Sequence, residues 1–180
     1  SNYSSLRKAY KEICNCNEPV KALINCAGIA SMNLAITTPP DITEQIIKTN
    51  LLGTIFCNQV FSPLIIRNKG GRIINFSTIA VSIGLKGESV YVASKAGVEG
   101  FSRVLAKELS PFNITVNCIA PGPIKTNLLS GISDEQISDI VKNQIIKKEM
   151  KTNDIVEMVD ILLNDNASNI TGQVLHVGGI

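Results

Sequence analysis

The stretch Ser89–Leu109, SVYVASKAGVEGFSRVLAKEL, places a tyrosine and a lysine four residues apart among small residues. Residues at that spacing share one face of a helix, so the sequence predicts that Tyr91 and Lys95 lie side by side. The small residues around them would let a large molecule approach both side chains. A bare Tyr-x-x-x-Lys pattern is more often a surface pair beside a packing seam, so the rest of the chain must decide between these two interpretations.

Outward from this helix, short apolar strands alternate with helical segments. Strands are predicted near residues 21–26, 72–77, 114–119 and 173–177, and helices near 4–14, 41–67 and 90–111. Continuous apolar strands that alternate with amphipathic helices are typical of a parallel sheet covered on both faces. The predicted fold class is therefore α/β, with strands in chain order and a ligand site beyond their carboxyl ends.

Several helix starts can also be predicted. Asp41 or Thr43 is expected to cap the helix that runs to about Arg67. After the third strand, SDEQISDIVKNQIIKKE and TNDIVEMVDILLN are predicted to be helical, each beginning with its own N-cap residue. The segment from about Asn127 to Glu149 is expected to cover the ligand site.

The composition excludes several classes of protein. The 180 residues suit one domain, and 44% hydrophobic with 18% charged residues excludes disorder. A net charge of +2 without a basic block gives no case for nucleic acid. No apolar run in the sequence approaches the ~20 residues of a membrane span, and the N-terminus does not resemble a signal peptide. We therefore expect a cytoplasmic protein with neither a nucleic-acid nor a membrane partner.

The five cysteines and one histidine do not suggest a metal site or a hydrolase. Cys14 and Cys16 lack further Cys or His at metal-ligand spacing, so no metal is expected. An odd number of scattered cysteines favours reduced thiols. A Ser-His-Asp hydrolase would have to use His176, which lies in the apolar strand QVLHV.

Four patches of the sequence together resemble the short-chain dehydrogenase/reductase family. The patches are INCAGI, IIKTNLLG, INFSTIAVSIGLKGESVYVASKAG, and VNCIAPGPIKTNL with NITGQVLHVGG. They follow the family order and spacing along nearly the whole chain, and most resemble the bacterial 3-oxoacyl-[acyl-carrier-protein] reductases. Two departures are Cys26, where the family has an Asn, and HVGG, which lacks the usual Asp or Asn before the Gly pair. The resemblance implies a Rossmann-type doubly wound parallel sheet.

The same resemblance implies the catalytic residues Asn50, Thr78, Tyr91 and Lys95. Tyr91 would be the acid/base, since hydride transfer to a carbonyl leaves an alkoxide that must be protonated. Lys95 would lower the pKa of Tyr91 and bind the nicotinamide ribose. Asn50 would bend its helix and hold a water that links Lys95 to solvent; the alternative is an ordinary helix Asn that faces water.

By the same resemblance, Thr78 is expected to supply the hydroxyl that polarises the substrate carbonyl. The family serine lies thirteen residues before the tyrosine, and this count leads to Thr78, with Ser77 immediately before it. Successive strand residues point to opposite faces, so the two hydroxyls are not interchangeable. A local shift that lets Ser77 serve remains the alternative.

The resemblance also implies NADP or NAD as the cofactor, with NADP favoured. Its predicted binding residues are Asn25, Ala27, Gly28, Tyr91, Lys95, Pro121, Gly122, Ile124 and Thr126. Alone, APGP is better explained as a turn that ends a strand, and Asn25 as a turn residue. Their assignment to a cofactor site depends on the agreement of all four patches.

The family's Gly-rich phosphate-binding turn is not found before VKALINCAG. We therefore expect residues 1–180 to form a single, incomplete dinucleotide-binding and catalytic domain, without the N-terminal strands of the fold. Its first strand should then present an exposed edge at residues 21–26, and the 180 residues alone should bind no cofactor and show no turnover.

The function implied is NAD(P)-dependent reduction of a small-molecule or acyl-carrier-linked carbonyl, as in fatty acid biosynthesis. A homo-oligomer, tetramer or dimer, is expected to form through the helices near 41–67 and 90–111. The alternative is a truncated, non-catalytic relative that acts only as an oligomerising or binding protein. The catalytic residues favour the enzyme, whereas the missing Gly-rich turn favours the alternative.

Overall fold

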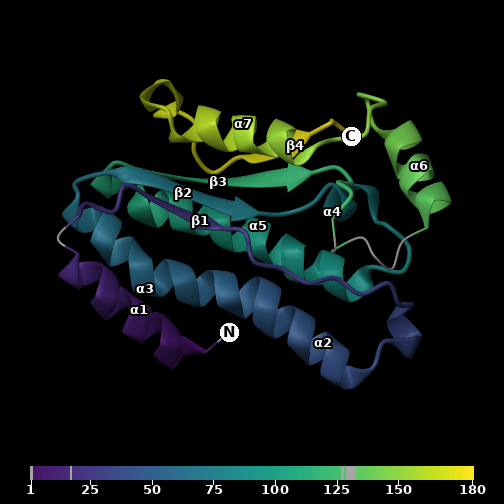
Figure 1. Cartoon of the computed structure of the whole chain (residues 1–180), viewed down its shortest axis with the longest axis horizontal. Coiled ribbons are helices and arrows are strands. Elements are labelled where there is room, and N and C mark those ends of the chain that lie inside the picture. The colour runs from purple at the N-terminus through teal and green to yellow at the C-terminus, as the bar shows by residue number, and fades with distance from the viewer. Residues whose placement is uncertain (1, 17, 127, 129–132) are drawn as a thin grey trace.

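The structure is a computed structural model that describes residues 2–16, 18–126, 128 and 133–180. Within this part of the chain, one sheet is formed by four strands: β1 (Ala22–Asn25), β2 (Gly71–Phe76), β3 (Ile114–Pro121) and β4 (Val174–Val177). They lie in the order β1-β2-β3-β4, and each neighbouring pair is parallel (Figure 1). The predicted strands, their order and the α/β class are confirmed.

The helices connect these strands. They are α1 (Tyr3–Asn15), α2 (Pro40–Ile46), α3 (Gly53–Arg67), α4 (Ala80–Ile83), α5 (Ser89–Leu109), α6 (Asp134–Asn143) and α7 (Thr152–Leu163). A π-helical segment, η2 (Ile47–Leu52), joins α2 to α3, and short 3-10 turns lie at η1 (Ala35–Thr37), η3 (Ser110–Phe112) and η5 (Asp165–Ala167).

Helices pack on both faces of the sheet because adjacent strand residues point to opposite sides. Ile73 of β2 packs in a core cluster with residues of α3 and α5, whereas the next residue, Ile74, packs with α7. Figure 1 shows α3 and α5 on one side of the sheet and α7 on the other, with α1 outside α3. Strand β3 is buried from Ile114 to Ala120, as expected for a parallel strand covered on both faces.

The first strand forms an edge of the sheet. Among the described residues, β1 pairs with β2 alone, and the Ile24 residue is 43% exposed. The predicted exposed edge at residues 21–26 is therefore confirmed. An apolar strand with unpaired backbone groups is a surface that readily pairs with other chains.

The predicted caps of the helix that runs to Arg67 are wrong. Pro39 occupies the N-cap position of α2 without a side-chain hydrogen bond, and Pro40 is the first helical residue. Proline suits this position because the first helical N–H groups lack intrahelical partners. Asp41 instead lies in the first turn, where a carboxylate interacts favourably with the helix dipole.

The two C-terminal helices begin and end differently from one another. Ser133 caps α6 in a capping box with Gln136, as expected, but the helix ends at Asn143 and does not continue through Glu149. In α7, Thr152 is the first helical residue and not the cap. The N–H of Lys151 donates to Oδ2 of Asp154 at 2.7 Å, which places the cap one residue earlier than predicted.

By length and composition alone, the continuous helical run Pro40–Arg67 could cross a membrane, and it is the one such helix among the described residues. Its buried residues include Asn50 and Asn58, both at most 1% exposed. The run lies against the sheet and α5, so its apolar character is explained by core packing (Figure 1).

Two glycines provide a test of this packing. A Cβ at Gly71 would overlap the backbone oxygen of Lys21 and Cγ2 of Ile65, whereas a Cβ at Gly100 of α5 would meet no atom within 4 Å. Gly71→Ala is therefore expected to lower the free energy of unfolding by about 1–3 kcal/mol. Gly100→Ala, the matched control, should raise it by up to about 1 kcal/mol, because alanine favours a helix. Urea denaturation measures both, and equal effects of the two substitutions would contradict this packing.

Candidate active site

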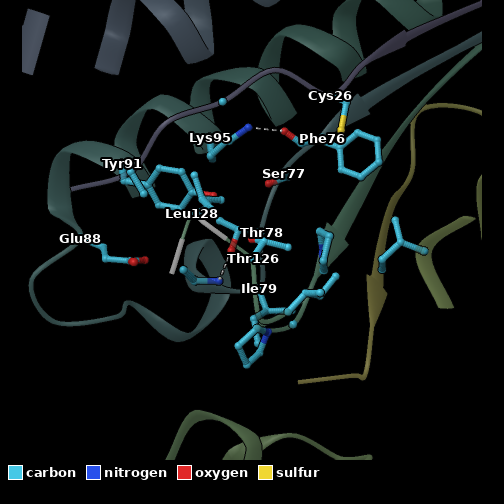
Figure 2. Close-up of a pocket in the computed structure, with 18 of the residues that line it drawn as sticks. Cys26, Phe76, Ser77, Thr78, Ile79, Glu88, Tyr91, Lys95, Thr126 and Leu128 are labelled. Atoms are coloured by element: carbon cyan, nitrogen blue, oxygen red, sulfur yellow. Dashed lines mark hydrogen bonds between the residues drawn. The ribbon is translucent and has the colours of Figure 1, made fainter. Parts of the chain in front are cut away.

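A cavity of about 440 Å³ lies beyond the carboxyl ends of the strands. It is lined by residues that follow β1 and β2, by the start of α5, by residues 121–126 after β3, and by one face of α7 (Figure 2). A volume of this size is in the range of small-molecule sites. The cavity lies where the sequence predicts the ligand site, and its role stays a prediction.

Most of the predicted site residues converge on this cavity. Those that line it are Gly28, Thr78, Tyr91, Lys95, Pro121, Gly122, Ile124 and Thr126. Asn25, Ala27 and Asn50 are not among its lining residues. Asn25 instead donates from Nδ2 to Oδ1 of Asn75 at 2.8 Å within the buried core, and Ala27 is exposed. Asn50 lies behind Gly28, at which a Cβ would be 3.5 Å from the Asn50 Oδ1.

Helix α5 places Tyr91 and Lys95 together, as the spacing predicted. Both are nearly buried, at 6% and 4% exposed, and the Lys95 Nζ lies 6.0 Å from the centre of the Tyr91 ring. The Lys95 Nζ donates to the carbonyl oxygen of Phe76 at 2.9 Å (Figure 2). The lysine is thereby held at the end of β2, and the interpretation of a solvated surface pair is wrong.

Burial controls the ionisation of Tyr91. The pKa of the phenol is raised to about 12, mainly by burial and also by the Glu88 carboxylate, while the hydrogen bond with the Thr78 hydroxyl lowers it. The expectation that Lys95 lowers this pKa does not hold in this structure. Desolvation of the phenolate outweighs the ammonium, which is directed to the Phe76 carbonyl. At neutral pH Tyr91 is therefore a phenol that can donate a proton.

Burial also acts on Lys95, in the opposite direction. It lowers the pKa of the ammonium to about 8, and Cys26 and Cys118 raise it to a smaller extent. The side chain is still mostly charged at pH 7. Because its pKa lies close to neutral, a modest change of environment is enough to change its protonation.

Asn50 is fully buried in the π-helical segment η2 and uses both ends of its amide. Its Oδ1 accepts from the N–H of Ile29 at 2.9 Å, while its Nδ2 donates to the Ile29 carbonyl oxygen at 2.9 Å and to Oγ of Ser94 at 3.0 Å. The helix is π-helical at Asn50, while the expected bend stays a prediction. The alternative of an Asn that faces water is wrong.

Ser77 and Thr78 have different partners, as expected of successive residues at a strand end. The Ser77 hydroxyl donates to Oε1 of Glu99 at 2.5 Å. The Thr78 Oγ1 accepts from the N–H of Ala80 at 3.2 Å, and its hydroxyl influences the Tyr91 phenol. Both residues line the cavity, but the Ser77 hydroxyl is committed to a carboxylate.

Two glycines of the cavity wall pack against polar side chains of this chain. A Cβ at Gly28 would lie 3.3 Å from the Lys95 Nζ, and one at Gly122 would overlap the Gln144 amide. The cavity brings the Tyr91 phenol and the Lys95 ammonium to one wall, and these groups suit the hydroxyls of the ribose at the nicotinamide end of a dinucleotide.

Sequence reasoning missed three polar residues of the site. Glu88 lines the cavity at 5% exposed, Glu99 holds Ser77, and Ser94 accepts from Asn50 while donating to the Tyr91 carbonyl oxygen at 2.6 Å. Glu88 could have been found, because it precedes Tyr91 by three residues, the spacing of helical neighbours. Nothing in the pattern singles out Ser94 or Glu99.

The described residues contain a Ser-His pair but not the Ser-His-Asp triad that a hydrolase of this type would need. Oγ of Ser82 lies 3.0 Å from Nε2 of His176 at an exposed position. Among the described residues, no carboxylate is hydrogen-bonded to the other ring nitrogen, and no cluster of His, Cys, Asp and Glu could hold a metal. All five cysteines are free thiols.

The fold and the site define an oxidoreductase of the Rossmann type, and comparison with known proteins agrees. A family model described as "Enoyl-(Acyl carrier protein) reductase" matches residues 1–179. The chain therefore belongs to the short-chain dehydrogenase/reductase family.

Its relatives include several proteins named 3-oxoacyl-[acyl-carrier-protein] reductase FabG. The one from Staphylococcus epidermidis is 35% identical over 174 residues, which cover 97% of this chain and 71% of the relative. The one from Staphylococcus aureus is 36% identical over 169 residues, covering 94% and 69%. The one from Aquifex aeolicus is 36% identical over 176 residues, covering 97% and 71%.

The buried ammonium leads to a pH-dependent stability. Below pH 8 the Lys95 side chain is protonated in both the folded and the unfolded chain. Between pH 8 and 10.5 it loses its proton in the folded chain but keeps it in the unfolded chain. The contribution of Lys95 to the free energy of unfolding should therefore rise by about 2 kcal/mol from pH 8 to pH 10. Urea denaturation of wild type and Lys95→Met across this range measures it as the difference between the two. Parallel pH profiles would contradict the lowered pKa.

Proposed function

We propose that the protein is an NAD(P)-dependent reductase that converts a carbonyl to an alcohol, most similar in substrate to the 3-oxoacyl-[acyl-carrier-protein] reductases. One observation carries the proposal: a buried, protonated Tyr91 shares one cavity with Lys95 and Thr78. The chemistry of carbonyl reduction needs a proton donor, a hydroxyl that polarises the carbonyl and a cationic group, and these three residues offer them.

In this proposal Tyr91 protonates the carbonyl oxygen as the alcohol forms. Its raised pKa keeps the proton on the phenol at neutral pH, so no preceding ionisation step is needed. Thr78 donates a hydrogen bond to the same oxygen and stabilises the negative charge that develops there. Ser77 is the alternative donor, but its hydroxyl would first have to leave Glu99.

A bound nicotinamide cofactor would supply the hydride. We propose that Lys95 and Tyr91 hold its ribose, with Gly28 and Gly122 on the wall of the same cavity. The remaining positions proposed for cofactor binding are Asn25, Ala27, Pro121, Ile124 and Thr126. NADP is proposed as the preferred form by analogy with the family.

Asn50 is proposed to support this chemistry from behind the cavity. Its hydrogen bonds to Ile29 and Ser94 fix the segment after β1 against α5, next to Gly28 and Lys95. It thereby keeps Lys95 in place, and a water bound beside it would extend a proton path from the lysine.

The proposed substrate is a small or acyl-carrier-linked 3-oxoacyl compound, and the proposed role is fatty acid biosynthesis in the cytoplasm. The names of the relatives support this class. Apolar residues of the cavity wall support it too, among them Ile79, Ile83 and Ile155. We also propose that residues 1–180 act as one catalytic domain.

Fluorescence titration of the 180-residue chain with NADH and NADPH tests the proposal directly. Binding followed by reduction of an acetoacetyl thioester would support the reductase. A folded chain that binds neither nucleotide would agree with the expectation that these 180 residues alone bind no cofactor, and the non-catalytic binding protein would then stand as the alternative. The expectation that these 180 residues alone do not turn over stays a prediction until this titration is done.

Substitutions at three hydroxyl groups test the assigned roles in any version of the protein that turns over. Tyr91→Phe should lower kcat by about 10²–10⁴-fold, since it removes the proton donor. Thr78→Val should lower it by about 10²–10³-fold, whereas Thr78→Ser should keep or raise activity. Steady-state assays measure these effects, with circular dichroism as the control for folding. A silent Thr78→Val combined with an inactive Ser77→Ala would assign the polarising role to Ser77 instead.

A homo-oligomer, tetramer or dimer, is proposed to form through α5 and the helical run Pro40–Arg67. Val104 of α5 is 56% exposed and Leu52 of η2 is 38% exposed, so both helices present apolar surface. Val104→Glu should shift the protein toward the monomer, because a buried unpaired carboxylate disfavours association. Sedimentation velocity at micromolar concentration measures this shift, with Glu108→Gln on the same helix as the control. A wild-type protein that sediments as a monomer would contradict the proposal.

A further inference from the structure

Glu88 stands out as a carboxylate enclosed in a largely apolar cavity. It occupies the N-cap position of α5, one turn before Tyr91, but its side chain makes no capping hydrogen bond. The residue is 5% exposed and lines the same cavity as Tyr91 and Thr78. Figure 2 shows its carboxylate extending into the cavity on the side of Tyr91.

Among the described residues, this carboxylate has no hydrogen-bond or ion-pair partner. Lys95 is directed to the Phe76 carbonyl oxygen at 2.9 Å, and Lys125 pairs with Glu149 at 3.2 Å. Residues 127 and 129–132, which lie outside the described part of the chain, include no lysine or arginine. Glu88 therefore has no cation from this chain to neutralise it.

Keeping an unpaired carboxylate here is unfavourable for the fold. Burial raises the pKa of Glu88, and its charge also disfavours ionisation of Tyr91. A role in helix capping is excluded by the geometry, and no ion pair offsets the cost of desolvation. An unpartnered acid directed into a ligand cavity is instead suited to a ligand that brings its own hydrogen-bond donor.

We propose that Glu88 binds a hydrogen-bond donor, a hydroxyl or an ammonium group, that the substrate carries next to its reacting carbonyl. The inference rests on the proposed function, because it places that carbonyl at Tyr91. Glu88 and Tyr91 line the same cavity, so the donor of the substrate lies near the reacting carbonyl. Within the proposed 3-oxoacyl class, the substrate is thereby narrowed to compounds that carry a hydroxyl or amino group next to the keto group.

Two ketones of nearly equal shape test the inference: 1-hydroxy-2-butanone carries a hydroxyl where 3-pentanone carries a methyl group. Their binding to the full chain is measured by ligand-observed NMR, with and without NADP. Wild type should bind the hydroxyketone about tenfold more tightly, as expected for a hydrogen bond to a charged group. Glu88→Gln should lose most of this preference. Glu108→Gln, an exposed position on the same helix, should keep it.

A second measurement uses the unmodified protein, in case Glu88→Gln does not fold. In ¹³C-glutamate-labelled wild type, the hydroxyketone should shift the carboxyl resonance of Glu88, whereas 3-pentanone should not. The inference is overturned if wild type binds the two ketones equally, binds neither, or keeps its preference in Glu88→Gln.

The outcomes also separate this inference from the proposed function. A preference that depends on Glu88, in a version of the protein that binds NAD(P)H and yet reduces neither ketone, would count against the reductase alone. Reduction with the same selectivity in wild type and Glu88→Gln would count against the role of Glu88 alone.

Discussion

The carboxamide of Asn50 joins the two parts of the chain that must meet for the site to exist. It bonds both backbone groups of Ile29, which follows β1, and the hydroxyl of Ser94, which lies between Tyr91 and Lys95 on α5. The amide is fully buried, so each hydrogen bond lost would leave a polar group unpaired at a cost of about 1–3 kcal/mol. This one side chain thus fixes the loop after β1 against α5, together with the hydrogen bond from the N–H of Asn33 to the carbonyl oxygen of Gly87 at 2.8 Å.

Next to Asn50, the apolar cavity favours the neutral forms of Tyr91, Glu88 and Lys95. The pKa values of Tyr91 and Glu88 are raised and that of Lys95 is lowered, with burial the largest cause in all three. The same enclosure that makes Tyr91 a proton donor at neutral pH brings the lysine close to its titration point. Among the described residues the Glu88 carboxylate has no hydrogen-bond or ion-pair partner, and the reaction proposed for Tyr91, Thr78 and Lys95 does not require it.

The elements of the fold could be predicted because each depends on its own residues. Continuous apolar runs such as Ile114–Ala120 predicted parallel strands, and the order of the strands followed from the alternation with helices. The ends of helices were less predictable. The run SDEQISDIVKNQIIKKE has helical polarity throughout, yet the helix stops at Asn143, and Gln144, 3% exposed, packs against Gly122 and Gly178. That contact involves residues distant in the sequence.

The sequence by itself determined that Tyr91 and Lys95 meet, because their spacing places them on one helix face, and that the segments after the strands lie near one another, because parallel strands bring their carboxyl ends together. The tertiary structure alone decided what those residues do to one another. The direction of a pKa shift depends on enclosure and on third partners. The Phe76 carbonyl that holds Lys95 and the Glu88 carboxylate beside Tyr91 are such partners. Neither effect is encoded in local spacing, since burial is produced by the packing of the whole chain.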